Sequence, residues 1–182
     1  MESVYLGFEE LFVDGDSHFA SEAVISSVIP LDGELLIVGN VDTIKQWRSV
    51  CHNLSIPASI IDTEGTSVDI LTALEAILKS NTRISHIIAS SDKSNALIAS
   101  LGMMARKYKR SFILVDNADN ATTIDMNQLN IDFLICADGK IVARRNRLVQ
   151  TEGNARVSAH DIYALWQRSM INRRATLEPM AC

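Results

Sequence analysis

The sequence has few cysteines, no long apolar run and no excess of basic residues, and each lack argues against a class of protein. Its three cysteines, Cys51, Cys136 and Cys182, form no CxxC pair, so they indicate reduced thiols instead of a disulfide framework or a metal site. No apolar run approaches the roughly 20 residues that cross a bilayer. A net charge of −5 disfavours nucleic acid as a partner.

The N-terminal sequence and the overall composition indicate a folded cytoplasmic protein. The first residues include acids and no basic cluster, which argues against a signal peptide. Hydrophobic residues make up 47% of the chain and charged residues 21%, a balance that favours a packed core over disorder. We expect one domain over residues 1–170 and a C-terminal tail over residues 171–182.

Short apolar runs alternate with amphipathic segments along the chain. The runs are typical of strands buried on both faces of a parallel sheet: Glu10–Val13, Glu34–Val38, Ala58–Ile61, Ile84–Ala89, Phe112–Val115, Phe133–Cys136 and Lys140–Ala143. The segments with helical periodicity are Ser17–Ile29, Asp42–Leu54, Ser67–Lys79, Lys93–Tyr108 and Ala159–Met170. This alternation predicts right-handed strand–helix–strand units.

The last two strands break the alternation because only Ala137, Asp138 and Gly139 separate them. Asp-Gly between two apolar runs is a strong signal for a tight hairpin, so the last strand should run antiparallel to its neighbours. The predicted fold class is therefore α/β: a three-layer α/β/α sandwich around a seven-stranded, mostly parallel sheet with the last strand reversed. Arg144, Arg145 and Arg147 follow that strand and are interpreted as residues at the sheet edge.

Candidate site residues lie where the predicted parallel strands end, since ligands of open parallel sheets bind beyond the carboxyl ends. Gly15 and Ser17 open the first helix and could hold a phosphate, although a turn with a helix cap is the favoured interpretation because Asp14 and Asp16 would repel an anion. Asp92, Asp116 and Asp119 could together bind a cation, or could cap turns. The four histidines are scattered, so no metal site is predicted.

Several stretches between roughly residues 10 and 170 resemble fold-type I pyridoxal-phosphate enzymes of the class V aminotransferases, most closely the 2-aminoethylphosphonate–pyruvate transaminases. The stretches that carry the resemblance are Glu22–Val38, Arg83–Ile88, Phe112–Asp116, Asn130–Leu134, Ile141–Leu148 and Gly153–Arg156. The resemblance implies the same large-domain fold.

The resemblance also implies roles for individual residues. Asp116 matches the aspartate that pairs with the ring nitrogen of pyridoxal phosphate. Gly15 and Ser17 fall in the phosphate cradle, and Asp119 stands where the family has a neutral polar residue that faces the cofactor. Lys140 falls at the Schiff-base lysine when it is counted forward from Phe133. When the match is counted back from Ile141–Leu148 instead, this chain lacks the loop that carries the family's lysine, and the Asp138-Gly139 hairpin stands in its place.

Other departures concern the cofactor site. Asp16 places an acid inside the phosphate cradle, no aromatic residue stands near Asp42–Thr43 to stack on the ring, and Ser91–Asn95 replaces an acid–threonine–threonine motif. We also expect that the family's N-terminal arm and small C-terminal domain are missing. These departures favour a degenerate, non-catalytic domain without cofactor that acts as a binding or oligomerisation module.

Two alternatives stay open. One is an active pyridoxal-phosphate aminotransferase with Lys140 as its lysine, completed by a partner chain. The other is the cation site of the three aspartates. Under each interpretation we expect a homodimer, because the large domains of the family pair across a broad face, with a protein partner as the further option and no membrane partner.

Overall fold

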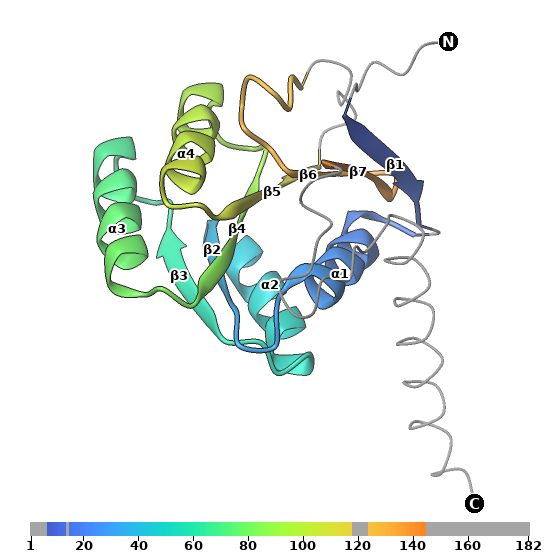
Figure 1. Cartoon of the computed structure of the whole chain (residues 1–182), viewed down its shortest axis with the longest axis horizontal. Helices are drawn as coiled ribbons and strands as arrows, with labels where there is room; N and C mark the ends of the chain where they lie inside the picture. Colours follow the sequence, from blue (N-terminus) through green and yellow to red (C-terminus); the bar gives the residue numbers. More distant parts are fainter. Residues whose placement is uncertain (1–6, 14, 118–123, 145–182) are drawn as a thin grey trace, which may run out of the picture.

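A seven-stranded sheet forms the centre of the molecule in a computed structural model that describes residues 7–13, 15–117 and 124–144 (Figure 1). The strands are β1 (Phe8–Phe12), β2 (Glu34–Gly39), β3 (Ala58–Asp62), β4 (Ile84–Ser90), β5 (Ser111–Asp116), β6 (Phe133–Cys136) and β7 (Lys140–Arg144). Their order across the sheet is β1-β7-β6-β5-β4-β2-β3.

Six strands run in one direction and β7 runs against them, as the sequence predicts. β2 to β6 pair in parallel, while β7 is antiparallel both to β6 and to β1. The reversed strand therefore lies inside the sheet, and β1 forms the edge beside it. Because β1 has the direction of β6, its carboxyl end lies at the same edge of the sheet as the other carboxyl ends.

The first strand begins earlier than predicted, at Phe8 instead of Glu10. Register with β7 sets its limits, because Phe8 lies opposite Arg144 and Phe12 lies opposite Lys140. The pattern of apolar residues missed this start because the two glutamates follow Phe8 directly. A strand at the edge of a sheet tolerates such exposed polar residues.

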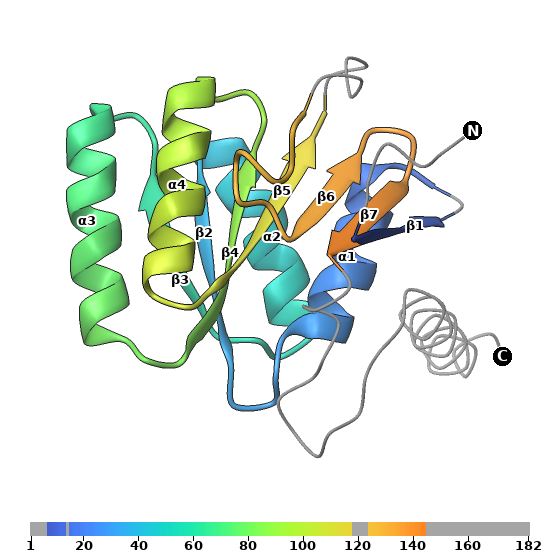
Figure 2. The same cartoon turned by 45° about the horizontal axis from the view of Figure 1, so that its top comes forward.

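Helices cover both faces of the sheet, so the predicted three-layer sandwich is confirmed (Figure 2). α1 (Ser17–Val28) and α2 (Val41–Asn53) lie on one face, and α3 (Ser67–Ser80) and α4 (Asn95–Lys107) lie on the other. Each begins after a side-chain cap that accepts a backbone N–H bond of the first turn. The caps are Asp16, Asn40, Thr66 and Ser94. Thr66 and Asp69 form a capping box at the start of α3.

Each face of the sheet packs against its own hydrophobic core. Strand side chains alternate between the faces, so Leu36 and Val38 join the core under α3 and α4, while Leu35 and Ile37 join the core under α1 and α2. The inner strands are buried on both faces, whereas the edge strands β1 and β3 are partly exposed. Buried apolar area of this extent is the main favourable contribution to the stability of a fold.

Arg144 corrects one prediction. It is the last residue of β7, which is an inner strand, and its guanidinium is partly buried in an ion pair with Asp132. It is therefore a structural residue and does not edge the sheet. Arg145, Arg147, the predicted helix Ala159–Met170 and the tail lie outside the described residues.

Candidate functional site

Polar side chains gather at the carboxyl edge of the sheet on the side of α1 and α2. The Ser17 hydroxyl at the start of α1 donates to Asn117 Oδ1 at 3.0 Å. Asn117 follows β5, and its Nδ2 lies 3.5 Å from the Ser90 hydroxyl at the end of β4. Three elements that are distant in sequence therefore meet through one amide side chain. This contact fixes the start of α1 against the ends of two central strands.

Asp116 lies on the other face of the same edge. Alternation along β5 directs it to the side of α3 and α4, because Phe112 and Leu114 belong to that core. It is 3% exposed, and its Oδ1 accepts a hydrogen bond of 2.6 Å from the Ser91 hydroxyl. A buried carboxylate at a strand end is the type of residue that can hold a protonated ring nitrogen or a cation.

A row of residues runs across the sheet from Asp116 to β1. Asp116 lies opposite Cys136 on β6. Lys140 is the residue of β7 directly before Ile141, which pairs with Ile135, and Phe12 of β1 lies opposite Lys140. Burial raises the pKa of the Cys136 thiol to about 11, and the negative charges of Asp138 and Asp116 add to the increase. The thiol is therefore protonated at neutral pH and is no nucleophile.

Lys140 directly follows a tight turn. The Gly139 N–H donates to the Cys136 carbonyl at 3.1 Å, Gly139 adopts φ +83°, and the Asp138 carboxylate accepts from the Lys140 N–H at 3.1 Å. The Lys140 ammonium lies 3.2 Å from the Glu10 carboxylate of β1 and 5.9 Å from the centre of the Phe12 ring. Of the two interpretations of this segment, the structure has the short hairpin.

The start of α1 is closed by its own cap. The Asp16 carboxylate accepts from the N–H of His18 at 3.0 Å and from the N–H of Phe19 at 3.2 Å. Gly15 adopts φ +146°, and a Cβ on it would lie 3.0 Å from the Phe19 ring. Gly15 and Ser17 thus form the turn and the first residue of a capped helix, which is the structural alternative that the sequence offered for them.

The three aspartates considered as a cation site do not form one among the described residues. Asp92 pairs with Lys93 at 3.4 Å, while Asp116 bonds to Ser91. Asp119 lies outside the described residues. In that same part of the chain, no group of three or more histidine, cysteine or acidic side chains is placed to hold a metal ion.

The start of α2 is where the resemblance places the family's aromatic residue that stacks on the cofactor ring. Asn40 caps the helix there with a bond to the Thr43 N–H at 2.9 Å, and the exposed side chain next to it is Val41. The nearest aromatic residue of α2 is Trp47, which is buried in the core beneath the helix. The described start of α2 therefore offers no stacking ring.

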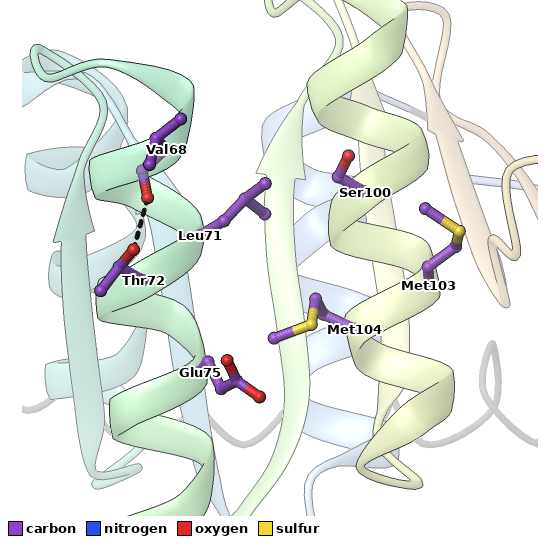
Figure 3. A pocket seen from close by; sticks show the side chains of 7 residues that line it. All are labelled: Val68, Leu71, Thr72, Glu75, Ser100, Met103 and Met104. Atoms are coloured by element: carbon purple, nitrogen blue, oxygen red, sulfur yellow. Dashed lines mark hydrogen bonds between the residues drawn. The ribbon is translucent and has the colours of Figure 1, made fainter.

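A hollow outside this edge lies between α3 and α4. It has a volume of about 340 Å³, and its lining residues are Val68, Leu71, Thr72, Glu75, Ser100, Met103 and Met104. Figure 3 shows Leu71 of α3 and Met104 of α4 pointing toward each other across it. The hollow lies in the outer helix layer and is separate from the row of residues that leads to Lys140.

Among the helices of the described residues, none is long and apolar enough to cross a membrane.

Comparison with curated proteins relates the chain to one group of enzymes, although no family model matches it. It is 28% identical over 175 residues to a 2-aminoethylphosphonate–pyruvate transaminase of Bacillus cereus, across 88% of the chain and 48% of the relative. It is 27% identical over 177 residues to a bifunctional phosphonoacetaldehyde hydrolase/aminoethylphosphonate transaminase of Clostridioides difficile, across 87% of the chain and 27% of the relative. The chain thus spans about half the length, or less, of these relatives.

Solved structures give the same fold. The ureidoglycine–glyoxylate aminotransferase of Bacillus subtilis superposes with a TM-score of 0.58 at 14% identity, across 88% of this chain and 42% of that one. The alanine–glyoxylate aminotransferase of Nostoc gives 0.56 at 10% identity, across 89% and 53%. A C-S lyase of Staphylococcus hominis, solved with pyridoxal phosphate bound, gives 0.58 at 12% identity, across 74% and 40%. The chain is thus a homologue of the 2-aminoethylphosphonate–pyruvate transaminases and has the fold of pyridoxal-phosphate-dependent transferases.

Proposed function

We propose that this aminotransferase-like chain does not carry out pyridoxal-phosphate chemistry and serves as a protein-binding module that pairs with a second copy of itself. The observation that carries the first part is the direction of the Lys140 side chain. Its amine pairs with Glu10 on β1, whereas Asp116 lies on β5, two strands away on the other side of β7. The amine that would have to bond to a cofactor therefore pairs toward β1, on the side of β7 away from the acid.

The residues at the carboxyl edge do not fit pyridoxal phosphate as a set. Asp116 suits the ring nitrogen, because it is a buried carboxylate at the end of a central strand. The amides at the start of α1 already bond to Asp16, and the start of α2 provides no stacking ring. A lysine that forms a covalent bond to a cofactor needs a backbone that can hold its amine over the ring. The four-residue turn before Lys140 provides little freedom for that.

Exposed apolar side chains at the same edge support the second part of the proposal. Phe12 is 64% exposed at the end of β1, and Phe19 and Val41 are exposed in the first turns of α1 and α2. Large apolar side chains that are exposed in this way favour burial against another protein surface. A closed symmetric dimer is the commonest way in which one chain covers such a surface.

The cofactor test combines pyridoxal phosphate with the purified chain. We expect no visible absorbance band beyond that of free cofactor, and borohydride reduction followed by peptide mapping should find label spread over surface lysines. The matched control is Lys140→Ala, which should give the same spectrum and the same map as the wild type. A band that reduction traps on Lys140, and that the Lys140→Ala variant lacks, would overturn the proposal.

The dimer test measures the mass of the chain in solution by light scattering. We expect a dimer for the wild type and a monomer for Phe12→Ser combined with Phe19→Ser. Leu31→Ser is the matched control, because Leu31 is 92% exposed but lies between α1 and β2 at the opposite edge of the sheet. A wild-type monomer, or a dimer that only Leu31→Ser disrupts, would contradict the assigned surface.

One observation favours an active aminotransferase as the second candidate. Asp116, Cys136 and Lys140 lie in one register row at the carboxyl edge, so the chain retains an acid and an amine at the same level of the sheet. In this case a partner chain would complete the site, and Asp116 would hold the ring nitrogen while pyridoxal phosphate supplies an electron sink. Label trapped on Lys140 is the outcome that separates this candidate from the first.

A further inference from the structure

Asp16 supplies a negative charge at the start of α1. Its carboxylate accepts hydrogen bonds from the N–H groups of His18 and Phe19, which are two amides of the first turn. Ser17, the first residue of the helix, donates its hydroxyl to Asn117, which directly follows β5. The positive end of the helix dipole is therefore already matched by a carboxylate of the chain itself.

A helix start at the carboxyl edge of a parallel sheet is where an anionic ligand would bind, since its free amides and its dipole both favour negative charge. A phosphate that approached α1 would compete with the Asp16 carboxylate for the same N–H groups. It would also meet a like charge within a few ångströms, which is unfavourable. The start of α1 is thus built as a closed cap and repels the group that its position could hold.

Glu10 pairs in a similar way with the amine of Lys140. Its carboxylate lies 3.2 Å from the Lys140 ammonium, where the Lys140 side chain is partly buried and Glu10 is exposed on the edge strand. The Phe12 ring lies near the same ammonium, so three residues from two adjacent strands form one contact. The pair draws the amine toward the sheet edge at β1 and away from Asp116.

We propose that Asp16 and Glu10 each oppose the binding of pyridoxal phosphate to this chain: Asp16 occupies the amides that would face its phosphate, and Glu10 holds the amine that would bond to it. This inference rests on the proposed function, because it assumes that the wild type lacks the cofactor. It goes further by naming two carboxylates that act against binding and whose removal should strengthen it.

The first step of the test isolates the phosphate part with inorganic phosphate as the probe. Asp16→Gly frees the amides at little cost to the helix, because glycine is an accepted cap, and Asp16→Asn removes the charge while it retains the cap. We expect phosphate to bind Asp16→Gly at least about tenfold more tightly than the wild type, with Asp16→Asn in between. Asp42→Asn is the matched control, since Asp42 is an acid in the first turn of α2 that does not cap it.

The second step uses pyridoxal phosphate with the double variant Glu10→Gln and Asp16→Gly. Relative to the wild type, we expect a higher melting temperature with cofactor and more borohydride label on Lys140. Glu9→Gln combined with Asp16→Gly is the control, because Glu9 neighbours Glu10 on β1 but alternates to the other face of the strand.

The outcomes distinguish the two proposals. If the wild type is silent and the double variant binds at Lys140, both stand. If neither binds, the chain lacks the cofactor for another reason, and the assignment to Asp16 and Glu10 is overturned while the proposed function stands. If the wild type itself carries label on Lys140, the proposed function fails and this inference fails with it.

Discussion

Arg144 and Asp132 form an ion pair across the β6–β7 hairpin, with Nε 3.2 Å from Oδ1. The same guanidinium donates to Asn127 Oδ1 at 3.0 Å and lies 4.6 Å from the centre of the Phe8 ring. The second oxygen of Asp132 accepts from the Phe112 N–H at 2.9 Å. One ion pair therefore joins β1, β5, β7 and the segment that leads into β6, next to the reversed strand.

Arg144→Ala should destabilise the chain by roughly 2–4 kcal/mol, because it removes the Arg144 cation from a pair with the Asp132 carboxylate, which is only 6% exposed. The measurement is urea unfolding followed by circular dichroism. Arg83→Ala is the control, since Arg83 is exposed and, within the part of the chain that the structure describes, its side chain donates one long bond of 3.3 Å to a backbone carbonyl. Its cost should stay below about 1 kcal/mol. Equal losses in the two variants would contradict a special role for the pair.

Local sequence patterns are enough to predict the order of strands and helices, whereas they do not predict this ion pair. Strand–helix alternation and the Asp-Gly turn are enough to predict the layers, the sheet class and the reversed strand. The role of Arg144 depends on which strands lie beside β7, and on a carboxylate twelve residues away in sequence that the turn brings to it. A basic residue after an apolar run gives no sign of this, so the sequence placed it at the sheet edge.

Gly139→Ala should destabilise the hairpin by roughly 1–3 kcal/mol. Gly139 has φ +83°, and a Cβ there would clash with the carbonyl of Val13 and lie 2.7 Å from that of Gly15. The Val13 N–H also donates to the Gly139 carbonyl at 3.2 Å, so the turn cannot move away from β1 without loss of that bond. Thermal unfolding measures the effect.

The control for the hairpin is Gly65→Ala. A Cβ on Gly65 would make only an ordinary contact with Asp69, 3.6 Å away, and its backbone needs no positive φ. We expect that change to alter stability by less than about 0.5 kcal/mol. If both alanine variants melt together with the wild type, the turn is less constrained than its geometry indicates.

The candidate site could be predicted only in part for a similar reason. The ends of the apolar runs locate Asp116 and Lys140 at one edge of the sheet, and the structure places them there. Glu10, which holds the lysine, lies 130 positions earlier in the sequence and meets it only because Phe12 pairs with Lys140. Strand register between distant segments follows from packing and not from a local pattern.

Native Cys51 and Cys136 should resist alkylation. Burial raises the pKa of both thiols to about 11, so at about pH 8 roughly one in a thousand is a thiolate. We expect iodoacetamide to modify them at least about 100-fold more slowly than glutathione. Mass spectrometry of the digested chain measures the label at each position. Unfolding in urea is the control and should make both residues react at the glutathione rate; fast labelling of either in the folded chain would contradict the burial.

Glu75 should make stability depend on acid pH. Its carboxylate accepts from Lys107 Nζ at 2.9 Å and from the Tyr108 hydroxyl at 2.9 Å, and it pairs with Lys79 at 3.2 Å. Hydrogen bonds from Lys107, Tyr108 and Lys79, in that order, lower its pKa from the ordinary value of 4.5 to about 2. Because the pKa falls on folding, the contribution of Glu75 to stability is fully present above about pH 4.5 and is lost as the pH falls toward 2.

The free energy of unfolding of wild type and Glu75→Gln should therefore differ by a constant amount above pH 4.5, and the two curves should converge between pH 4.5 and 2. Added salt should shrink the difference, because the pairs with the two lysines are at the surface. Tyr108→Phe is the more specific variant: it removes one donor and should raise the Glu75 pKa toward 4.5, which a carbon-detected NMR titration of the carboxyl group measures. Curves that stay parallel down to pH 2, with an unchanged titration in Tyr108→Phe, would show that these bonds between α3 and α4 do not hold the carboxylate in its charged form.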